Sequence, residues 1–315
     1  MIPPVTGRLA PSPTGSQHVG NARTYLLAWL AARSRGGRVA LRIEDIDIWR
    51  NKPHAAAEAL DDLRWLGLDW DGDPVVQSAR LPAHAAALAV LKRRELVYPC
   101  TCTRSDITAA ASAPHAGQDG PTYPGTCAGR SAADAARLTV PYAWRFRVRH
   151  TPAFGDEVVG RVEIDLRDHG GDFVVWRSAN VPAYQLAVVV DDAAAGVTHV
   201  LRGDDLIPST PRQVLLYEAL NLPVPTFAHV PLVVGPDGRR LAKRHGDARL
   251  SALRAAGVGP GALLGLLARS CGWQTEATPT TARELLRSYR LDTLPAGPLV
   301  LTPEMMAGVG FLAGK

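Results

Sequence analysis

The segment RLAPSPTGSQHVGNAR, residues 8–23, links a predicted strand to a predicted helix through a loop rich in proline and glycine. The strand covers residues 5–10, and apolar residues recur at helical spacing from Ala22 to Leu30. Such a loop lets the backbone approach a ligand closely, and the helix after it offers unpaired N–H groups and a positive dipole end. His18, directly before the helix, can donate a hydrogen bond to a phosphate oxygen. The segment therefore predicts a phosphate site, although its spacing alone also fits an ordinary strand–turn–helix.

Strands and helices alternate on both sides of this segment, which predicts an α/β fold with a parallel sheet and crossover helices. A strand is expected at 38–43, followed by helices at 53–67 and 82–96. The apolar run at 183–190 predicts a strand that is buried on both faces. The elements expected after it are a strand at 197–203, a helix from Thr210 to Leu220 opened by a Thr210/Gln213 capping box, a strand at 229–234 and a turn at 236–238.

Changes in composition and in the strand–helix pattern divide the chain into four parts. Residues 1–98 and 181–247 are expected to form the two halves of a nucleotide-binding sheet. Residues 99–180 form an insertion between them, with short strands in its second half. Residues 248–315 are helix-prone and are expected to form a short C-terminal helical part.

Composition restricts the class of protein. The 315 residues are 46 % hydrophobic and 21 % charged, which excludes a wholly disordered chain. A formal net charge of +5 permits an acidic partner such as RNA without requiring one. A membrane span and a signal peptide are not expected, because the sequence contains no apolar run of about 18 residues and no charged start followed by an apolar stretch. Four cysteines are too few for a disulfide scaffold, so we expect a reducing compartment, the cytoplasm.

A second segment, GRRLAKRHG at 238–246, places four cations and a histidine in a loop bounded by glycines. Such a loop can close over a polyphosphate and stabilise the charge that develops on it. Composition alone also fits a solvated basic loop.

Together the two segments resemble the two signature motifs of the class I aminoacyl-tRNA synthetases. The motif named HIGH corresponds to residues 18–21, with Asn21 in place of the second histidine. The motif named KMSKS corresponds to residues 240–244, with Arg240 and Ala242 in place of a lysine and a serine, while Lys243 keeps the ATP-contacting lysine. With RIEDID at 42–47 and RGDDL at 202–206, the chain resembles the glutamyl and glutaminyl branch over residues 7 to 247.

The resemblance implies a Rossmann-type parallel sheet, with ATP and Mg²⁺ as substrate. It implies that His18 and Lys243 are catalytic. The ATP-binding residues that it implies are His18, Gly20, Asn21 and Lys243.

Glutamate has two carboxylates and an ammonium group, so its site needs cations and an anion. Arg8, Glu44 and Arg202 stand on or directly after predicted strands, where ligands bind in open α/β sheets. Charge alone leaves open that Glu44 and Arg202 are structural ion-pair partners. The glutamate-binding residues that the resemblance implies are Arg8, Leu9, Ala10, Pro11, Ser12, Glu44, Tyr184 and Arg202.

Three cysteines near the start of the insertion, Cys100, Cys102 and Cys127, offer soft ligands for a metal. A structural zinc site needs a fourth ligand, and ligand chemistry alone favours His115. The alternative is three buried or free cysteines. C-x-C followed by Y-x-x-x-C resembles the zinc pattern of some members of this branch, and the resemblance implies a structural Zn²⁺ held by Cys100, Cys102, Tyr123 and Cys127. Cys271 lies in an apolar stretch and is expected in the core.

Only about 70 residues follow the second signature motif, which leaves no room for the helical domains with which a full glutamyl-tRNA synthetase reads the anticodon. The chain therefore resembles the shortened glutamyl-queuosine tRNA(Asp) synthetase family. This resemblance implies that L-glutamate is activated with ATP without tRNA and is then transferred to the queuosine base at the wobble position of tRNA(Asp), by a monomer. The alternatives are a truncated glutamyl-tRNA synthetase that charges the tRNA 3′ end, and a catalytically dead RNA-binding paralogue.

Overall fold

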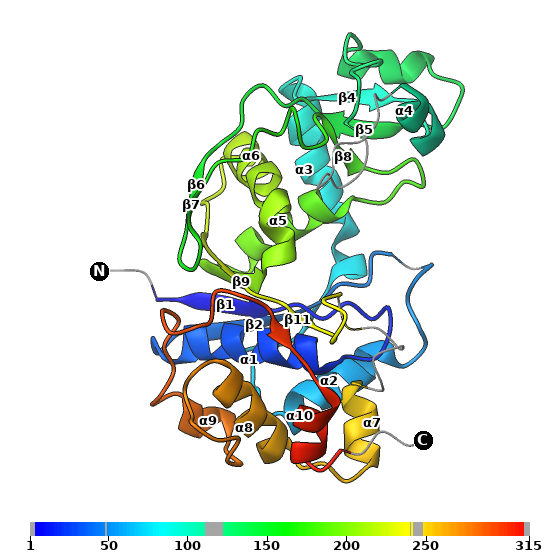
Figure 1. Ribbon diagram of the computed structural model, residues 1–315. Coiled ribbons are helices and arrows are strands. Elements are labelled where there is room, and N and C mark those ends of the chain that lie inside the picture. Colours follow the sequence, from blue (N-terminus) through cyan, green and yellow to red (C-terminus); the bar gives the residue numbers. More distant parts are fainter. Residues whose placement is uncertain (1–3, 48, 111–121, 240, 242–247, 312–315) are drawn as a thin grey trace.

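The computed structural model describes residues 4–47, 49–110, 122–239, 241 and 248–311 (Figure 1). Two sheets lie edge to edge at its centre. The first has the order β1-β2-β3, formed by Thr6–Leu9, Arg38–Ile43 and Val75–Val76. The second has the order β7-β6-β10-β9, formed by Gly160–Val162, Phe154–Asp156, Thr226–Val230 and His199–Gly203. All pairings in these two sheets are parallel in the described part of the chain, except that of β6 with β7.

Strands β1 and β9 hold the two sheets together. The Thr198 backbone N–H donates to the Thr6 carbonyl over 2.9 Å, and Arg8 Nη1 donates to the Leu201 carbonyl over 2.7 Å. The chain continues from β1 to β2 on one side and from β9 to β10 on the other, so the strand order reverses between β1 and β9. In open parallel sheets, ligands bind beyond the carboxyl ends of the strands at such a reversal. The predicted α/β fold with a parallel sheet is confirmed.

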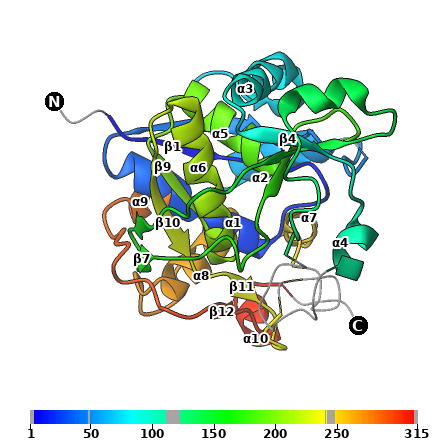
Figure 2. The same ribbon diagram turned by 90° about the horizontal axis from the view of Figure 1, so that it is seen from above.

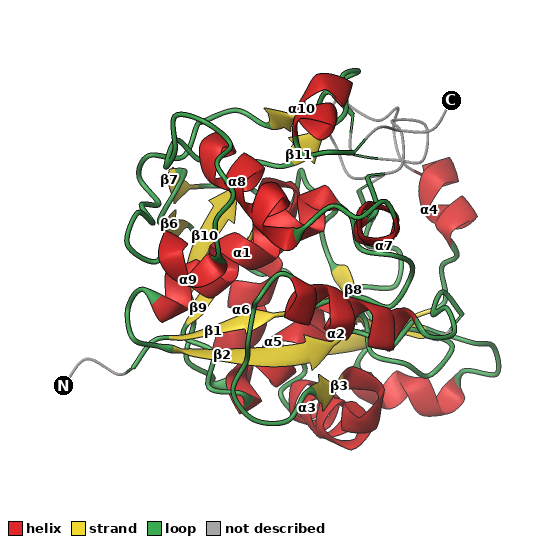
Figure 3. Ribbon diagram, turned by 90° about the horizontal axis from the view of Figure 1, so that it is seen from below, coloured by secondary structure: helices red, strands yellow, loops and turns green. Residues whose placement is uncertain are grey.

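Helices cover both faces of the central sheet (Figure 1). α1 (Val19–Arg33) and α2 (Ala55–Trp65) lie on the face that Figure 3 shows from below. α3 (Leu81–Arg93), α5 (Tyr184–Ala194) and α6 (Thr210–Leu220) lie on the opposite face, with α5 and α6 side by side in the view from above (Figure 2). The predicted helices, namely the one that follows the first motif and those expected at 53–67 and 82–96, are therefore confirmed.

The close packing of α1 on β1 depends on a glycine in the strand. A Cβ atom at Gly7 would lie 3.0 Å from the Cβ of Ala32, closer than ordinary van der Waals contact. Gly7 therefore lets α1 approach the strand and places the start of α1 next to the carboxyl end of the sheet.

The prediction of a strand at 183–190 is wrong, because this segment begins helix α5. Leu186, Ala187, Val188 and Val189 are all buried, so the helix is covered on most of its circumference. A segment buried on all sides shows no helical periodicity, and a short apolar run cannot distinguish a strand from a helix.

The strand predicted at 229–234 is interrupted. β10 ends at Val230, and β11 (Val233–Val234) leaves the sheet to pair with β12 (Leu299–Val300). Pro231 lies between them and has no N–H to continue the ladder. The turn predicted after it is present, with Gly238 at φ +71°.

The C-terminal part is helical, as predicted, and packs against the face of the sheet that carries α1 (Figure 3). Its core includes Leu263 and Leu267, which join Leu26 and Leu30 of α1, and Cys271 is fully buried there as expected. The helices are α7 (Leu250–Ala255), α8 (Pro260–Ser270), α9 (Ala282–Leu285) and α10 (Pro303–Gly308).

The segment predicted as an insertion forms a separate antiparallel sheet of order β4-β5-β8. Its strands are Val97–Cys100, Ala143–Phe146 and Phe173–Trp176, and α4 (Arg104–Ala110) follows β4. The same segment also supplies β6 to the central sheet, where it pairs with β10. No helix in the described residues is both long and apolar enough to cross a membrane.

Candidate active site

A cavity of about 630 Å³ opens at the reversal of strand order, at the carboxyl ends of β1 and β9. Its volume is within the usual range for small-molecule sites. The predicted site residues that line it are Arg8, Ala10, Ser12, His18, Gly20, Asn21, Glu44, Tyr184 and Arg202. Leu9 and Pro11 are buried and do not line it; the Pro11 carbonyl instead accepts the Glu44 N–H over 3.0 Å. Lys243 lies outside the described residues.

His18 is the N-cap of helix α1. Its Nδ1 accepts hydrogen bonds from the backbone N–H groups of Gly20, at 3.1 Å, and Asn21, at 3.4 Å. Burial lowers the pKa of His18, which keeps the ring neutral. A neutral imidazole that accepts through Nδ1 carries its proton on Nε2, so this residue offers the pocket an Nε2–H donor.

The predicted unpaired N–H groups at the start of α1 are not found. The Val19 N–H donates to the Ala248 carbonyl at 2.9 Å, the Gly20 and Asn21 N–H groups donate to His18, and the Ala22 N–H donates to the His18 carbonyl. The side-chain oxygen of Asn21 also accepts a hydrogen bond from the His18 N–H at 3.0 Å, which completes a capping box. A phosphate at this end of the cavity would therefore meet the His18 ring and the dipole of α1 rather than free backbone donors.

The described residues that flank 242–247 in the sequence lie at the same place. Leu241 lines the cavity. On the other side, residues 248–250 pair with residues 17–19, since the Leu250 N–H donates to the Gln17 carbonyl at 2.8 Å in addition to the Val19 bond. The residues between, 242–247, lie outside the described part of the chain, as does Arg240.

Arg202 is a buried cation that faces the cavity with only 5 % of its surface exposed. Its three nitrogens donate to neutral acceptors, namely His229 Nε2 at 3.0 Å, Gln213 Oε1 at 2.8 Å and Thr210 Oγ1 at 2.8 Å. Within the described residues no carboxylate forms an ion pair with it, so the alternative that charge alone left open, a structural ion-pair partner, does not describe Arg202. Burial lowers the pKa of Arg202, and the charge of Asp192, which forms no ion pair with it, offsets this effect only in part. The arrangement therefore presents to a ligand a buried positive charge that has no direct carboxylate partner among the described residues.

The partners of Arg202 correct the prediction of a capping box at Thr210. The N-cap of α6 is Ser209, and Thr210 is its first helical residue. The hydroxyl of Thr210 and the amide of Gln213 hold the guanidinium instead of capping the helix. His229 is held in turn by Asp156, whose Oδ2 is 2.6 Å from His229 Nδ1. This bond fixes the proton on Nδ1 and leaves Nε2 as an acceptor for Arg202.

Glu44 follows β2 and supplies negative charge to the cavity. Its Oε1 accepts from Arg42 Nη2 at 2.9 Å and its Oε2 accepts from the Ser12 hydroxyl at 3.2 Å. Glu44 is thus an ion-pair partner and also a cavity residue, so the two interpretations of this residue do not exclude each other. Tyr184, the first residue of α5, lines the same cavity, and burial raises the pKa of its hydroxyl.

Several cavity residues were not expected from the sequence. Tyr25 lies within the stretch from Ala22 to Leu30 whose spacing predicts an apolar helix face, but its hydroxyl donates to Gln17 Oε1 at 2.7 Å at the cavity wall. Gly203 permits a close approach there, because a Cβ would lie 2.5 Å from Asp205 Oδ1 and 2.7 Å from Leu232 Cδ2. The motif RGDDL pointed to this position, but no local pattern marks Tyr25 or Gln17.

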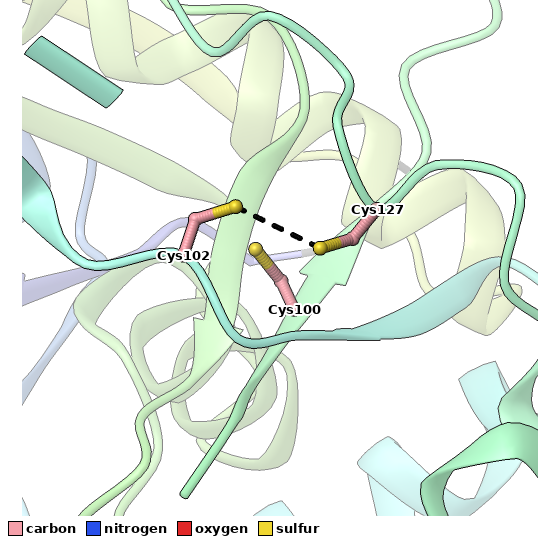
Figure 4. Close-up of side chains that lie close together, drawn as sticks. All are labelled: Cys100, Cys102 and Cys127. Atoms are coloured by element: carbon pink, nitrogen blue, oxygen red, sulfur yellow. Dashed lines mark hydrogen bonds between the residues drawn. The ribbon is translucent and has the colours of Figure 1, made fainter. Parts of the chain in front are cut away.

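The three cysteines of the insertion converge on one point, with their sulfur atoms within 4.8 Å of one another (Figure 4). Cys102 Sγ lies 3.7 Å from Cys127 Sγ, and the Tyr123 hydroxyl lies 3.4 Å from Cys100 Sγ and 4.0 Å from Cys102 Sγ. A tetrahedral zinc site places two sulfurs about 3.8 Å apart and a sulfur and an oxygen about 3.5 Å apart. These four residues therefore have the spacing of a zinc ligand set. His115 lies outside the described residues.

The surroundings of the thiols differ: burial raises the pKa of Cys102 to about 11, whereas Cys127 has partners that favour a thiolate. Burial by itself raises the pKa of Cys127, but hydrogen bonds from Thr101, Tyr123 and Cys102 lower it to about 7. The Arg145 side chain donates to Cys100 Sγ at 3.2 Å. Thiolate is the form of cysteine that binds metals.

Comparison with known proteins identifies the family. Residues 4–294 match the family model described as "tRNA synthetases class I (E and Q), catalytic domain". The chain belongs to this family. The curated glutamyl-Q tRNA(Asp) synthetase of Rhodopirellula baltica is 54 % identical over 277 residues, which cover 84 % of each chain. That of Symbiobacterium thermophilum is 49 % identical over 318 residues, covering 96 % of this chain and 98 % of the relative.

A solved structure shows the same fold. The glutamate–tRNA synthetase of Elizabethkingia anophelis superposes with a TM-score of 0.82 at 24 % identity, covering 97 % of this chain and 69 % of that one. The predicted class I synthetase fold is thus confirmed, and the chain is a ligase of the aminoacyl-tRNA synthetase class that uses ATP. Among its class I relatives, those at 44 to 54 % identity over most of the chain are glutamyl-Q tRNA(Asp) synthetases, as the sequence motifs predict.

Proposed function

We propose that this protein activates L-glutamate with ATP in the absence of tRNA and transfers the glutamate to the queuosine base at the wobble position of tRNA(Asp). The observation that carries the proposal is the buried Arg202, which faces the cavity without a carboxylate partner. The cavity that it faces lies in a chain about half of whose residues are identical to those of curated glutamyl-Q tRNA(Asp) synthetases.

Activation is a reaction between two bound substrates. An oxygen of the glutamate α-carboxylate attacks the α-phosphorus of ATP, and the bond to the β-phosphate oxygen breaks. The products are a mixed anhydride, glutamyl-adenylate, and pyrophosphate. Because the protein forms no covalent bond to either substrate, its contribution is to hold them in line and to stabilise the developing charge.

Each end of the cavity suits one substrate. Arg8 and Arg202 offer positive charge for carboxylates, and Glu44 offers negative charge for the ammonium group. At the other end, His18 Nε2–H and the dipole of α1 suit the phosphates of ATP, which binds with Mg²⁺. Lys243, two residues after Leu241, which lines the cavity, would stabilise the departing pyrophosphate.

In the second half-reaction, a hydroxyl of the modified base attacks the carbonyl carbon of the mixed anhydride. An ester forms and AMP leaves. The cavity therefore has to be reached by an anticodon loop rather than by a free amino acid alone.

Zinc is the metal that suits the cluster in the insertion, because soft thiolates in a tetrahedral set with one oxygen select it. Cys100, Cys102, Tyr123 and Cys127 would hold it. With four protein ligands it would leave no open position, so it would stabilise the fold of the segment and take no part in the reaction.

The decisive experiment is glutamate-dependent exchange between ATP and labelled pyrophosphate with no RNA present. Robust exchange supports the proposal. Exchange that appears only with tRNA(Glu) would instead indicate a glutamyl-tRNA synthetase, and no exchange under any condition would indicate an RNA-binding paralogue. Transfer is then measured with tRNA(Asp) that carries queuosine and with the same tRNA that carries guanosine, and only the first should accept glutamate.

A further inference from the structure

Helix α5 carries two consecutive buried carboxylates, Asp191 and Asp192, with 2 % and 4 % of their surfaces exposed. Successive positions on a helix point about 100° apart, so the two side chains meet different neighbours. Neither residue lines the cavity. A buried carboxylate is costly unless it is paired, so each requires its own set of partners.

Asp192 lies between two arginines of the central sheet. Its Oδ1 accepts from Arg42 Nη1 at 2.5 Å, and its Oδ2 lies 3.9 Å from Arg8 Nε. Arg8 Nε is buried and has no hydrogen-bond partner, so this carboxylate oxygen is what faces it. Arg8 itself lines the cavity.

Arg42 extends the contact to the acidic residue of the cavity. It donates through Nε at 3.3 Å and Nη2 at 2.9 Å to the same oxygen of Glu44. Although burial disfavours its charge, Asp192 and Glu44 together raise the pKa of Arg42. Arg42 thus bridges the carboxylates of Asp192 and Glu44, so the position of the Glu44 carboxylate depends on the Asp192 carboxylate.

We propose that Asp192 is a positioning residue for the amino-acid substrate. It orients Arg8 directly and Glu44 through Arg42. It therefore fixes the positions of the cation that binds a substrate carboxylate and of the anion that binds the substrate ammonium group. Without its charge, Arg42 has Glu44 as its remaining carboxylate partner and draws that group away from the cavity, while Arg8 loses the group that faces its Nε. This inference rests on the proposed use of glutamate.

Asp191 supplies a matched control on the same helix. It accepts from Gln77 Nε2 at 2.9 Å, Arg80 Nε at 3.1 Å and His84 Nε2 at 3.0 Å. None of these three residues lines the cavity. The charge of Asp191 acts on Arg42 from a distance, but only Asp192 contacts Arg42 and Arg8 directly. The substitutions Asp191→Asn and Asp192→Asn therefore remove the same charge from neighbouring buried positions, and only Asp192→Asn removes a direct contact with the amino-acid site.

The experiment compares the full-length wild type with both variants by pyrophosphate exchange without RNA. For Asp192→Asn we expect the KM for glutamate to rise about tenfold or more while the KM for ATP stays within about twofold. For Asp191→Asn we expect both KM values to stay within about twofold, whatever the loss of thermal stability. A glutamate KM that is unchanged in Asp192→Asn, or that rises equally in both variants, overturns the inference.

Two further measurements keep the outcome decisive. If Asp192→Asn does not fold, the variant Arg42→Lys tests the same path, because lysine keeps the charge but cannot bind both carboxylates in a fixed geometry. Arg42→Lys should raise the KM for glutamate and leave the KM for ATP unchanged. An unchanged KM for glutamate overturns the inference.

The thermal stabilisation of the wild type by glutamate alone is measured in parallel. If the wild type shows neither stabilisation nor exchange, the proposed function fails; if it shows both and Asp192→Asn matches it, only the role of Asp192 fails.

Discussion

His18 has two roles that two substitutions can separate. Its Nδ1 caps helix α1, and its Nε2 is the donor that we assign to the phosphates. His18→Ala removes both. His18→Asn restores a side-chain acceptor at the N-cap, where asparagine is among the preferred residues, but the shorter side chain carries no donor at the position of Nε2.

The structure sets the size of each effect. One of the two capping bonds is long, at 3.4 Å, so loss of the cap should cost about 1 kcal/mol, or about 2 °C in Tm. Loss of one donor that stabilises transition-state charge should lower kcat by about 10²- to 10³-fold. We therefore expect both variants to lose activation of glutamate to a similar extent, while only His18→Ala loses stability.

Pyrophosphate exchange gives the rate, and thermal unfolding without ligands gives the stability. His18→Asn with wild-type kcat would refute the assignment of Nε2 to the phosphates. Equal destabilisation of both variants would refute the capping role.

Three other perturbations test the remaining parts of the site. Lys243→Ala should lower the rate of pyrophosphate exchange by about 10²- to 10³-fold, by loss of the charge that stabilises the leaving group, and an unchanged rate would exclude that role. Cys127→Ser should release zinc and destabilise the insertion, and metal analysis that finds full occupancy would contradict the ligand set. Since burial lowers the pKa of His18, the folded protein binds fewer protons there than the unfolded chain as the pH falls below about 6.5, and stability declines in that direction. Wild type should therefore lose more stability than His18→Asn between pH 7.5 and 5.5; equal losses in the two proteins would contradict this.

The parts of the site that the sequence predicted are those built from short motifs. His18, Ser12 and Arg8 lie on one strand–loop–helix unit, while Glu44 directly follows β2 and Arg202 is the next-to-last residue of β9. Their convergence follows from the geometry of a parallel sheet, in which all carboxyl ends meet at one edge. Local pattern and fold class were sufficient for these residues.

The predictions from the sequence are wrong where contacts between distant parts of the chain determine the local structure. The strand predicted at 183–190 is helix α5, because complete burial removes the periodicity that would have marked a helix. The unpaired N–H groups predicted at the start of α1 are satisfied by His18 and by the Ala248 carbonyl, a partner more than 200 residues away. No local pattern carries that information.

The hydrogen-bond and ion-pair partners of each arginine, rather than its charge alone, indicate which arginine is suited to bind the substrate. Arg8, Arg42 and Arg202 are all buried beside the cavity and are indistinguishable as charges in the sequence. Arg42 contacts two carboxylates, Arg8 has one at 3.9 Å, and Arg202 donates only to neutral groups. A guanidinium that already contacts carboxylates gains little from a substrate carboxylate, whereas one that is buried with only neutral hydrogen-bond acceptors gains most. We therefore expect Arg202 to be the strongest anchor for the substrate in this cavity, and Arg42, which does not line the cavity, to act on the substrate only through the carboxylates that it holds.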